Sequence, residues 1–183
     1  MGIFERIANA IFHIATGDTK KRWLYTPLVA LLFLCFISLF FIAAYFTDRW
    51  LSLPSISYPP WTLIAGLVLL APGFTIVAWT WVQFWRAHGT PAPVNPPHEL
   101  ITSGLYAYCR NPMLSGIFLM IFGAGLLMGS LSLIAFYAPL FVLALYLEAS
   151  RIEEREMELK FGRAYLEYKQ RVPMFFPRLP QDK

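Results

Sequence analysis

Polar and aromatic side chains are concentrated in two segments that flank one long uncharged stretch. The first segment carries His98, Glu99 and Tyr106 and ends at Asn111, and the second carries the acid Glu153. A carboxylate accepts hydrogen bonds from ammonium and hydroxyl groups, and an aromatic ring stacks on flat rings or faces a cation. Together these residue types can enclose a small polar ligand.

Glu153 is the most informative of these residues because it extends an apolar stripe. The stripe recurs at helical spacing through Met157, Phe161, Tyr165, Tyr168 and Val172. Four residues before Met157 it reaches Glu153, where an acid is costly unless it is paired or binds a cationic group. The alternative is a structural salt bridge to Arg110 or Arg151. Glu148, Glu156 and Glu158 are interpreted as ion-paired or solvated positions, whereas Glu154 is ambiguous.

The segment between residues 86 and 111 is the longest connection in the chain, and prolines preset its backbone. A long ordered loop in a compact protein is typical of a functional site, and the alternative is a plain linker. Pro112 suits the first turn of a helix, and Asn111 suits the cap before it. The first amides of that helix favour a nearby anionic group.

The elements that position these residues are predicted to cross a membrane. The 183 residues are 57% hydrophobic and 14% charged, which is too apolar for a soluble domain. Residues 24–46 and 61–85 carry no charge and are each long enough for one span, the second with a kink at Pro72. Residues 112–147 are uncharged and predict a helical hairpin that turns at Gly129 and Ser130. Its glycines permit close helix contact: Gly116, Gly123 and Gly125.

Four spans place both termini on one side of the membrane. Most basic residues then flank that side, so the termini and the loop of residues 86–111 are expected in the cytoplasm. The fold class is therefore an all-α integral membrane protein with a cytoplasmic C-terminal helix. An apolar stripe in residues 1–23 predicts an interfacial amphipathic segment. Residues 24–86 form the next part, with two membrane helices, and residues 87–183 form the core that carries the loop, the hairpin and the final helix.

Two other functional classes are excluded by the residue pattern. The net charge is +4, but the basic residues flank apolar segments, which is typical of lipid headgroup contacts and not of nucleic-acid binding. The histidines and cysteines are scattered without ligand spacing, so no metal site is expected.

Two blocks of sequence together resemble one enzyme family. The block HELITSGLYAYCRNPMLSG begins at His98, and the block EEREMELKFGRAYLEYKQRVP begins at Glu153. Both blocks, in this order and separated by a hairpin-sized interval, resemble the superfamily of isoprenylcysteine carboxyl methyltransferases and phospholipid methyltransferases.

The resemblance implies an enzyme that uses S-adenosyl-L-methionine as methyl donor, bound in a pocket that faces the cytoplasm. The residues implied to bind it are His98, Glu99, Leu100, Ile101, Tyr106, Asn111, Pro112, Met113, Leu114 and Glu153. The implied acceptor is a lipid or lipophilic small molecule that enters from the bilayer: an isoprenylcysteine-like carboxylate, a phospholipid amine or another small lipophilic molecule. Arg110 or Arg151 would orient an anionic acceptor.

The chain departs from the family pattern at two positions. Leu114 stands where a tyrosine is usual, and Ala149 stands where enzymes acting on prenylated cysteine have an arginine. Two alternative functions remain open at this point. One is a membrane reductase of the sterol reductase type that uses NADPH, and the other is a membrane scaffold without catalysis.

Overall fold

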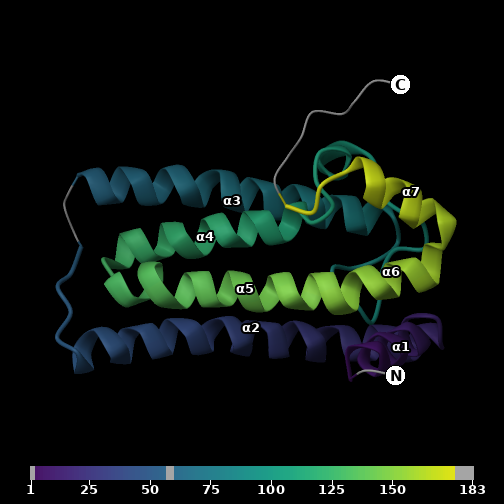
Figure 1. The fold of residues 1–183 in the computed structure, drawn as a ribbon, viewed down its shortest axis with the longest axis horizontal. Helices are drawn as coiled ribbons and strands as arrows, with labels where there is room; N and C mark the ends of the chain where they lie inside the picture. The colour runs from purple at the N-terminus through teal and green to yellow at the C-terminus, as the bar shows by residue number, and fades with distance from the viewer. Residues whose placement is uncertain (1–2, 57–59, 176–183) are drawn as a thin grey trace. The chain divides into compact units, whose positions relative to one another are not determined.

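The computed structural model describes residues 3–56 and 60–175, and within these ranges the regular structure is entirely helical (Figure 1). The α-helices are α1 (Ile3–Ala15), α2 (Thr19–Trp50), α3 (Trp61–Arg86), α4 (Pro112–Met128), α5 (Ala138–Glu148), α6 (Glu154–Phe161) and α7 (Arg163–Arg171). A short 3₁₀ helix, η1 (Gly104–Ala107), lies in the long loop, and two π-helical turns, η2 (Leu133–Tyr137) and η3 (Ala149–Glu153), flank α5. The predicted all-α membrane fold is confirmed.

The predicted spans correspond to these helices. Three helical stretches are long and apolar enough to cross a membrane: Thr19–Trp50, Trp61–Arg86 and the continuous Leu133–Phe161. The fourth apolar helix, α4, has 17 residues, which is the lower limit for a span. The stretch of residues 112–147 divides at Gly129, as predicted for a hairpin. The cytoplasmic location of the termini stays a prediction.

Two compact units make up the chain, and each is described by itself. We call the first the loop-and-tail unit (Met1–Leu31, Trp79–Pro112 and Tyr146–Lys183) and the second the bundle unit (Leu32–Ala78 and Met113–Leu145). The three-part organisation predicted from the sequence stays a prediction.

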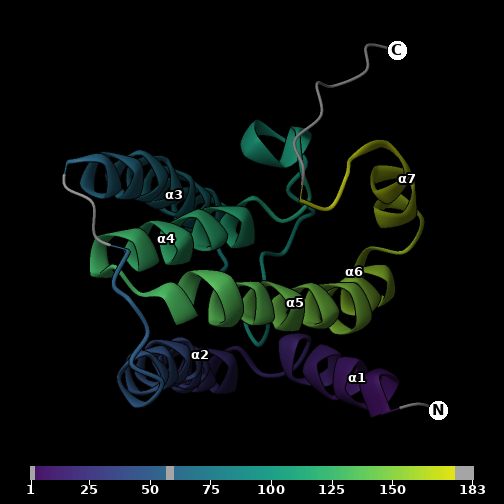
Figure 2. The same ribbon diagram turned by 60° about the vertical axis from the view of Figure 1, so that its left-hand side comes forward.

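The bundle unit buries a small apolar core between helices that lie side by side in the order α3, α4, α5 and α2 (Figures 1 and 2). Phe141 is fully buried at the centre, and the rings of Phe36 and Phe40 pack on it at centroid distances of 5.6 and 5.2 Å. Most other large apolar side chains of α2 and α3 are exposed. This pattern is expected when lipid, and not water, surrounds the helices.

Glycines let α3 and α4 approach closely. A Cβ atom built on Gly73 would lie 2.7 Å from the carbonyl oxygen of Gly116, and one on Gly123 would lie 2.8 Å from that of Gly66. The predicted close helix contact is confirmed, and for Gly116 and Gly123 the neighbouring helix is α3. They are seven residues apart and share one helix face, whereas Gly125 lies on another face and packs on Ile134.

In the loop-and-tail unit, α1 packs against η3 and α6. The side chains of Ala8 and Ala15 are buried, while Ile3, Phe4 and Ile7 are exposed. The predicted amphipathic segment is therefore a helix whose small residues face the protein. Its position at a membrane interface stays a prediction.

Candidate functional site

The loop that follows α3 begins with a compact turn. The backbone N–H of Thr90 donates to the carbonyl of Asn95 at 2.8 Å, and the N–H of Asn95 donates to that of Ala92 at 2.9 Å. Residues 94–97 are buried. The turn is ordered by its own hydrogen bonds, so this part of the connection is a folded element and not a plain linker.

After this turn, the loop forms the 3₁₀ helix η1, which presents Tyr106. The helix η1 begins at Gly104, whose φ of +62° is strained for any residue with a Cβ atom. A Cβ atom there would also lie 2.4 Å from Nε2 of Gln83, which donates to the carbonyl of Ser103. Tyr106 is only 8% exposed, and its ring lies edge-on to that of Phe84. A glycine at position 104 is therefore needed to set Tyr106 against α3.

The tail folds back onto this loop. Gly162 has φ +53° and ψ −128°, and it separates α6 from α7. Beyond it, Tyr165 and Tyr168 are buried, and the hydroxyl of Tyr168 donates to the backbone carbonyl of Tyr106 at 2.7 Å. Burial raises the pKa of both phenols above its ordinary value. The aromatic stripe predicted from the sequence thus packs inward, against the loop.

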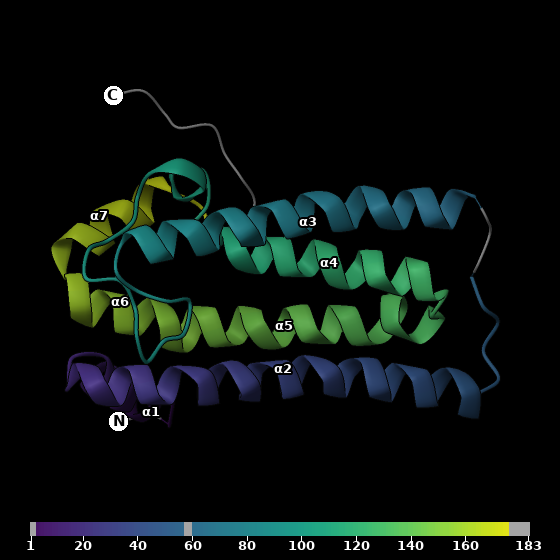
Figure 3. The same cartoon turned by 180° about the vertical axis from the view of Figure 1, so that it is seen from behind.

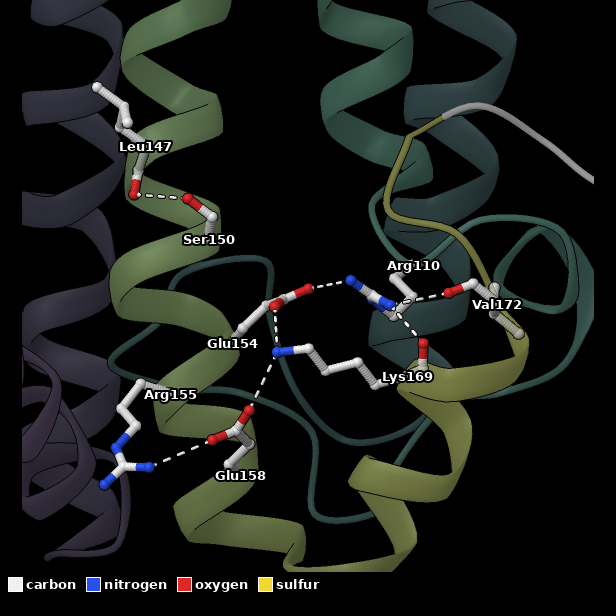
Figure 4. Close-up of polar contacts among 8 residues, drawn as sticks. All are labelled: Arg110, Leu147, Ser150, Glu154, Arg155, Glu158, Lys169 and Val172. Carbon is white, nitrogen blue, oxygen red and sulfur yellow. Dashed lines mark hydrogen bonds and ion pairs between the residues drawn. The ribbon is translucent and has the colours of Figure 1, made fainter.

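Arg110 joins the loop to both tail helices (Figure 4). Its guanidinium donates to the carbonyls of Lys169 and Val172, both at 2.8 Å, and forms an ion pair with Glu154. These carbonyls lie at the C-terminal end of α7, where they have no partner within the helix. The side chains of Arg110 and Glu154 are only 10% and 8% exposed.

Lys169 completes this network from α7. Its Nζ lies 2.6 Å from Glu154 Oε2 and 3.1 Å from Glu158 Oε1. Burial alone would lower the pKa of Lys169, but the hydrogen bonds and negative charges of Glu154 and Glu158 raise it above its ordinary value. Glu158 is therefore ion-paired, as interpreted from the sequence.

The carboxylate of Glu153, in contrast to that of its neighbour Glu154, has no counter-charge in the described part of the chain. It is half-buried, and within residues 3–56 and 60–175 it forms no hydrogen bond or ion pair. The expected alternative of a salt bridge to Arg110 or Arg151 is wrong, because Arg110 is paired with Glu154 and Arg151 is exposed. Burial is the main reason that the pKa of the Tyr106 phenol lies above its ordinary value, and the negative charge of Glu153 raises it further. Tyr106 and Glu153 are therefore close enough to interact.

The π-helical turn η3 explains why acids cluster here. Residues five apart on an α-helix point about 140° apart, whereas a π turn bonds residue i to i+5 and stacks such residues. Glu148 precedes this turn and Glu153 ends it, and the two carboxylates repel one another. Glu154 and Glu156 add further negative charge at Glu153.

Glu156 differs from its interpretation as an ordinary surface or ion-paired position. Its side chain is only 3% exposed, and its Oε1 has no hydrogen-bond partner among the described residues. The available signal was its spacing of three residues from Glu153, which places both acids on neighbouring positions of one helix face.

The remaining candidate residues have different positions. His98 and Glu99 are exposed, Leu100 and Ile101 are half-buried, and Pro112 is buried, all in the loop-and-tail unit. The backbone N–H groups of Arg110 and Asn111 donate to the carbonyls of Pro173 and Met174, at 2.8 and 3.0 Å. Met113 and Leu114 belong to the bundle unit, where Leu114 packs against the apolar core. The structure thus brings together Tyr106, Arg110 and the acids of the tail.

Several known proteins are similar to this chain. Residues 61–164 match the phospholipid methyltransferase family. The protein-S-isoprenylcysteine O-methyltransferase of Rattus norvegicus is 30% identical over 126 residues, which cover 68% of this chain and 44% of that protein. The cobalt-zinc-cadmium resistance protein CzcN of Cupriavidus metallidurans is 40% identical over 82 residues, 45% of this chain and 37% of that protein. The chain therefore spans less than half the length of these curated relatives.

A solved structure shows the same fold. The eukaryotic intramembrane Ras methyltransferase known as isoprenylcysteine carboxyl methyltransferase aligns with a TM-score of 0.55 and 22% identity, over 96% of this chain and 62% of that one. The family match includes the loop, the hairpin and the tail helix up to residue 164, and so contains both Tyr106 and Glu153. The chain belongs to the phospholipid methyltransferase family of integral membrane proteins.

Proposed function

We propose that this protein transfers a methyl group from S-adenosyl-L-methionine to a lipophilic acceptor that it reaches from the bilayer. Membership of the phospholipid methyltransferase family supports the reaction class. The observation that carries the proposal is the Glu153 carboxylate, which interacts electrostatically with Tyr106 and has no counter-charge among the residues that the structure describes. A buried or half-buried carboxylate in this state fits a ligand that brings its own positive charge.

The chemistry of the residues fits the methyl donor. Glu153 would accept hydrogen bonds from the ammonium or ribose hydroxyl groups, and Tyr106 would offer an aromatic surface. His98 and Glu99 are exposed polar groups on the same unit, and Leu100 and Ile101 are the adjacent apolar ones. Asn111 and Pro112 complete the proposed set within the loop-and-tail unit, and a role for Met113 and Leu114 stays a prediction from the family resemblance.

The sulfonium group supplies an already activated methyl group, so the protein has only to bind, align and exclude water. The bond from sulfur to the methyl carbon breaks as the bond from the acceptor to that carbon forms, and the sulfonium becomes a neutral thioether. A neutral primary or secondary amine becomes an N-methylammonium group that afterwards releases one proton, whereas a tertiary amine becomes a quaternary ammonium and releases none.

Within this proposal an amine acceptor is favoured over a carboxylate. Glu148 and Glu153 place two acidic side chains close together here, and Arg110 is already used by Glu154. Position 149, where an arginine would hold an acceptor carboxylate, is a fully buried alanine. Arg151 is exposed, and its role in orienting an acceptor stays a prediction. A carboxylate would meet repulsion here, whereas an amine would not.

The direct test combines binding and turnover. Purified protein in detergent is titrated with S-adenosylhomocysteine and, separately, with NADPH, so binding of NADPH alone would favour the reductase alternative. Glu153→Gln should weaken S-adenosylhomocysteine binding about tenfold or more, because a hydrogen bond to a charged group is lost. Glu158→Gln, on the next turn of the helix, is the matched control and should change binding little. Equal affinity in both variants would contradict the assigned role of Glu153.

The acceptor is identified with a labelled methyl donor and a total membrane lipid extract. A methyl ester releases labelled methanol in alkali, whereas an N-methyl group is stable. The amine proposal predicts an alkali-stable label, and an alkali-labile label would show that the acceptor is a carboxylate. An absence of label, together with unimpaired donor binding, would support the scaffold alternative.

A further inference from the structure

Two positively charged side chains hold the compact turn of the loop from outside. Nη2 of Arg22, near the start of α2, donates to the carbonyl of Pro96 at 3.3 Å, and Nζ of Lys160, on α6, donates to that of Pro97 at 2.7 Å. Figure 3 shows the loop crossing α6 toward the start of α2. The two carbonyls are consecutive, and the next residue is His98.

The proline pair explains why outside donors are needed. Proline has no backbone N–H, so the carbonyls are the only polar main-chain groups that Pro96 and Pro97 offer. Both residues are buried, and a buried carbonyl without a donor is costly. Arg22 and Lys160 therefore supply the polar contacts that this dipeptide cannot make with its own amides.

The same turn is closely packed on its inner side. A Cβ atom built on Gly89 would lie 2.4 Å from the backbone nitrogen of Pro97, so Gly89 and the proline pair are in direct main-chain contact. With the hydrogen bonds from Thr90 and Asn95, the turn is held as one piece. The direction in which the chain leaves toward His98 then depends on where the two donors hold it.

The charged groups near Arg22 and Lys160 are not all paired. Arg22 is 5% exposed and lies close enough to Lys160 for the two charges to repel. Glu156, one turn before Lys160, offsets this repulsion by attracting Lys160. Nε of Arg22 and Oε1 of Glu156 have no hydrogen-bond partner within the described part of the chain. Buried charges in this state cost stability, which a purely structural contact would avoid.

We propose that Arg22 and Lys160 are positioning residues that hold Pro96 and Pro97 and thereby fix the loop that presents His98 and Glu99. The functional part of this inference rests on the proposed methyl transfer, whereas the clamping of the turn does not. Arg22 lies outside residues 61–164, which match the family, so the N-terminal segment of this chain contributes to the loop from beyond the matched region.

The test measures hydrogen exchange of the Thr90 and Asn95 amides in the full-length protein in detergent. Lys160→Met and Arg22→Met should each speed this exchange about tenfold or more, because each removes a hydrogen bond from a charged donor. Lys160→Arg should restore most of the protection, since it keeps a donor and a charge. Arg163→Met, on the neighbouring helix, is the control and should leave exchange unchanged, because the Arg163 side chain is 91% exposed.

The readouts keep the two proposals separate. If the turn exchanges at the wild-type rate in folded Lys160→Met and Arg22→Met proteins, the positioning role is refuted. If the turn loosens but the affinity for S-adenosylhomocysteine and the KM for the donor do not change, the clamp exists and its role in donor binding is refuted. If the wild-type protein binds no S-adenosylhomocysteine, the proposed function fails, and exchange alone decides on the clamp. Should Arg22→Met not fold, Arg22→Gln is measured in its place.

Discussion

Arg110 is expected to be the most important single side chain for holding the tail on the loop. Arg110→Met removes its ion pair with Glu154 and its hydrogen bonds to the carbonyls of Lys169 and Val172, while its aliphatic stem is largely kept. The perturbation therefore reports on the polar contacts of the guanidinium and little on packing.

The expected loss can be worked out from burial. Removing one partner of a buried ion pair costs about 3–5 kcal/mol. Lys169 remains within 2.6 Å of Glu154 and still offsets its charge, which places the expected cost at the lower end, about 3 kcal/mol. For a chain of this length the apparent Tm should fall by about 6–12 °C.

The assay is thermal unfolding in detergent, with Arg163→Met as the matched control. Arg163 forms an exposed pair with Glu167, which should contribute at most about 0.5 kcal/mol. The double variant with Glu154→Gln should lose less than the sum of the two single variants, because they share one interaction. If Arg110→Met lowered the apparent Tm no more than Arg163→Met does, the buried network would not hold the tail. A fall in kcat without a change in Tm would instead support the predicted role of Arg110 in orienting an acceptor.

Three further predictions follow from the same contacts. Gly162→Ala should destabilise the protein by about 1–3 kcal/mol, because its φ of +53° with ψ −128° suits only glycine, and unchanged unfolding would contradict this. Gly116→Leu should separate α4 from Gly73 and lower the apparent Tm, whereas a wild-type Tm would show that the close contact is dispensable. The contribution of Tyr168 and Lys169 to stability should be fully present below about pH 10 and fall above it, because the raised pKa values of both groups keep them protonated in the folded protein when the unfolded chain begins to lose these protons. Unfolding at pH 8 and pH 11 measures this, Tyr168→Phe should reduce the fall, and equal stability at both pH values would refute it.

The main elements were predictable because they follow from local patterns. Uncharged runs of sufficient length predicted the membrane helices, and Gly129 within a run too long for one crossing predicted the hairpin. The stripe that includes Tyr165 and Tyr168 predicted a face that packs inward or on the membrane surface, and these two residues are buried. Such features depend on hydropathy and spacing alone.

The pairing of charges was not predictable in the same way. The sequence suggested Glu153 as the possible partner of Arg110, and only the fold shows that the partner is the neighbouring Glu154. Glu156 was interpreted as an ordinary ion-paired or solvated acid, because its spacing from Glu153 shows only that the two acids are neighbours on the helix, and it is tertiary packing that buries Glu156. For Gly116 the sequence could predict close packing but could not choose between the two neighbouring helices.

The π-helical turn η3 also has a consequence for how this site can change over time. A substitution alters one side chain, but the loss of one residue from Ala149–Glu153 would tighten the turn to an ordinary α-helix. Glu148 and Glu153 would then lie four residues apart on an α-helix, about 40° apart around its axis, and would stay neighbours. If the turn tightened without the loss of a residue, the same two acids would point about 140° apart. The side of the helix on which Glu148 lies therefore depends on the geometry of the turn and on its number of residues together, and a substitution scan of individual positions does not sample the number of residues.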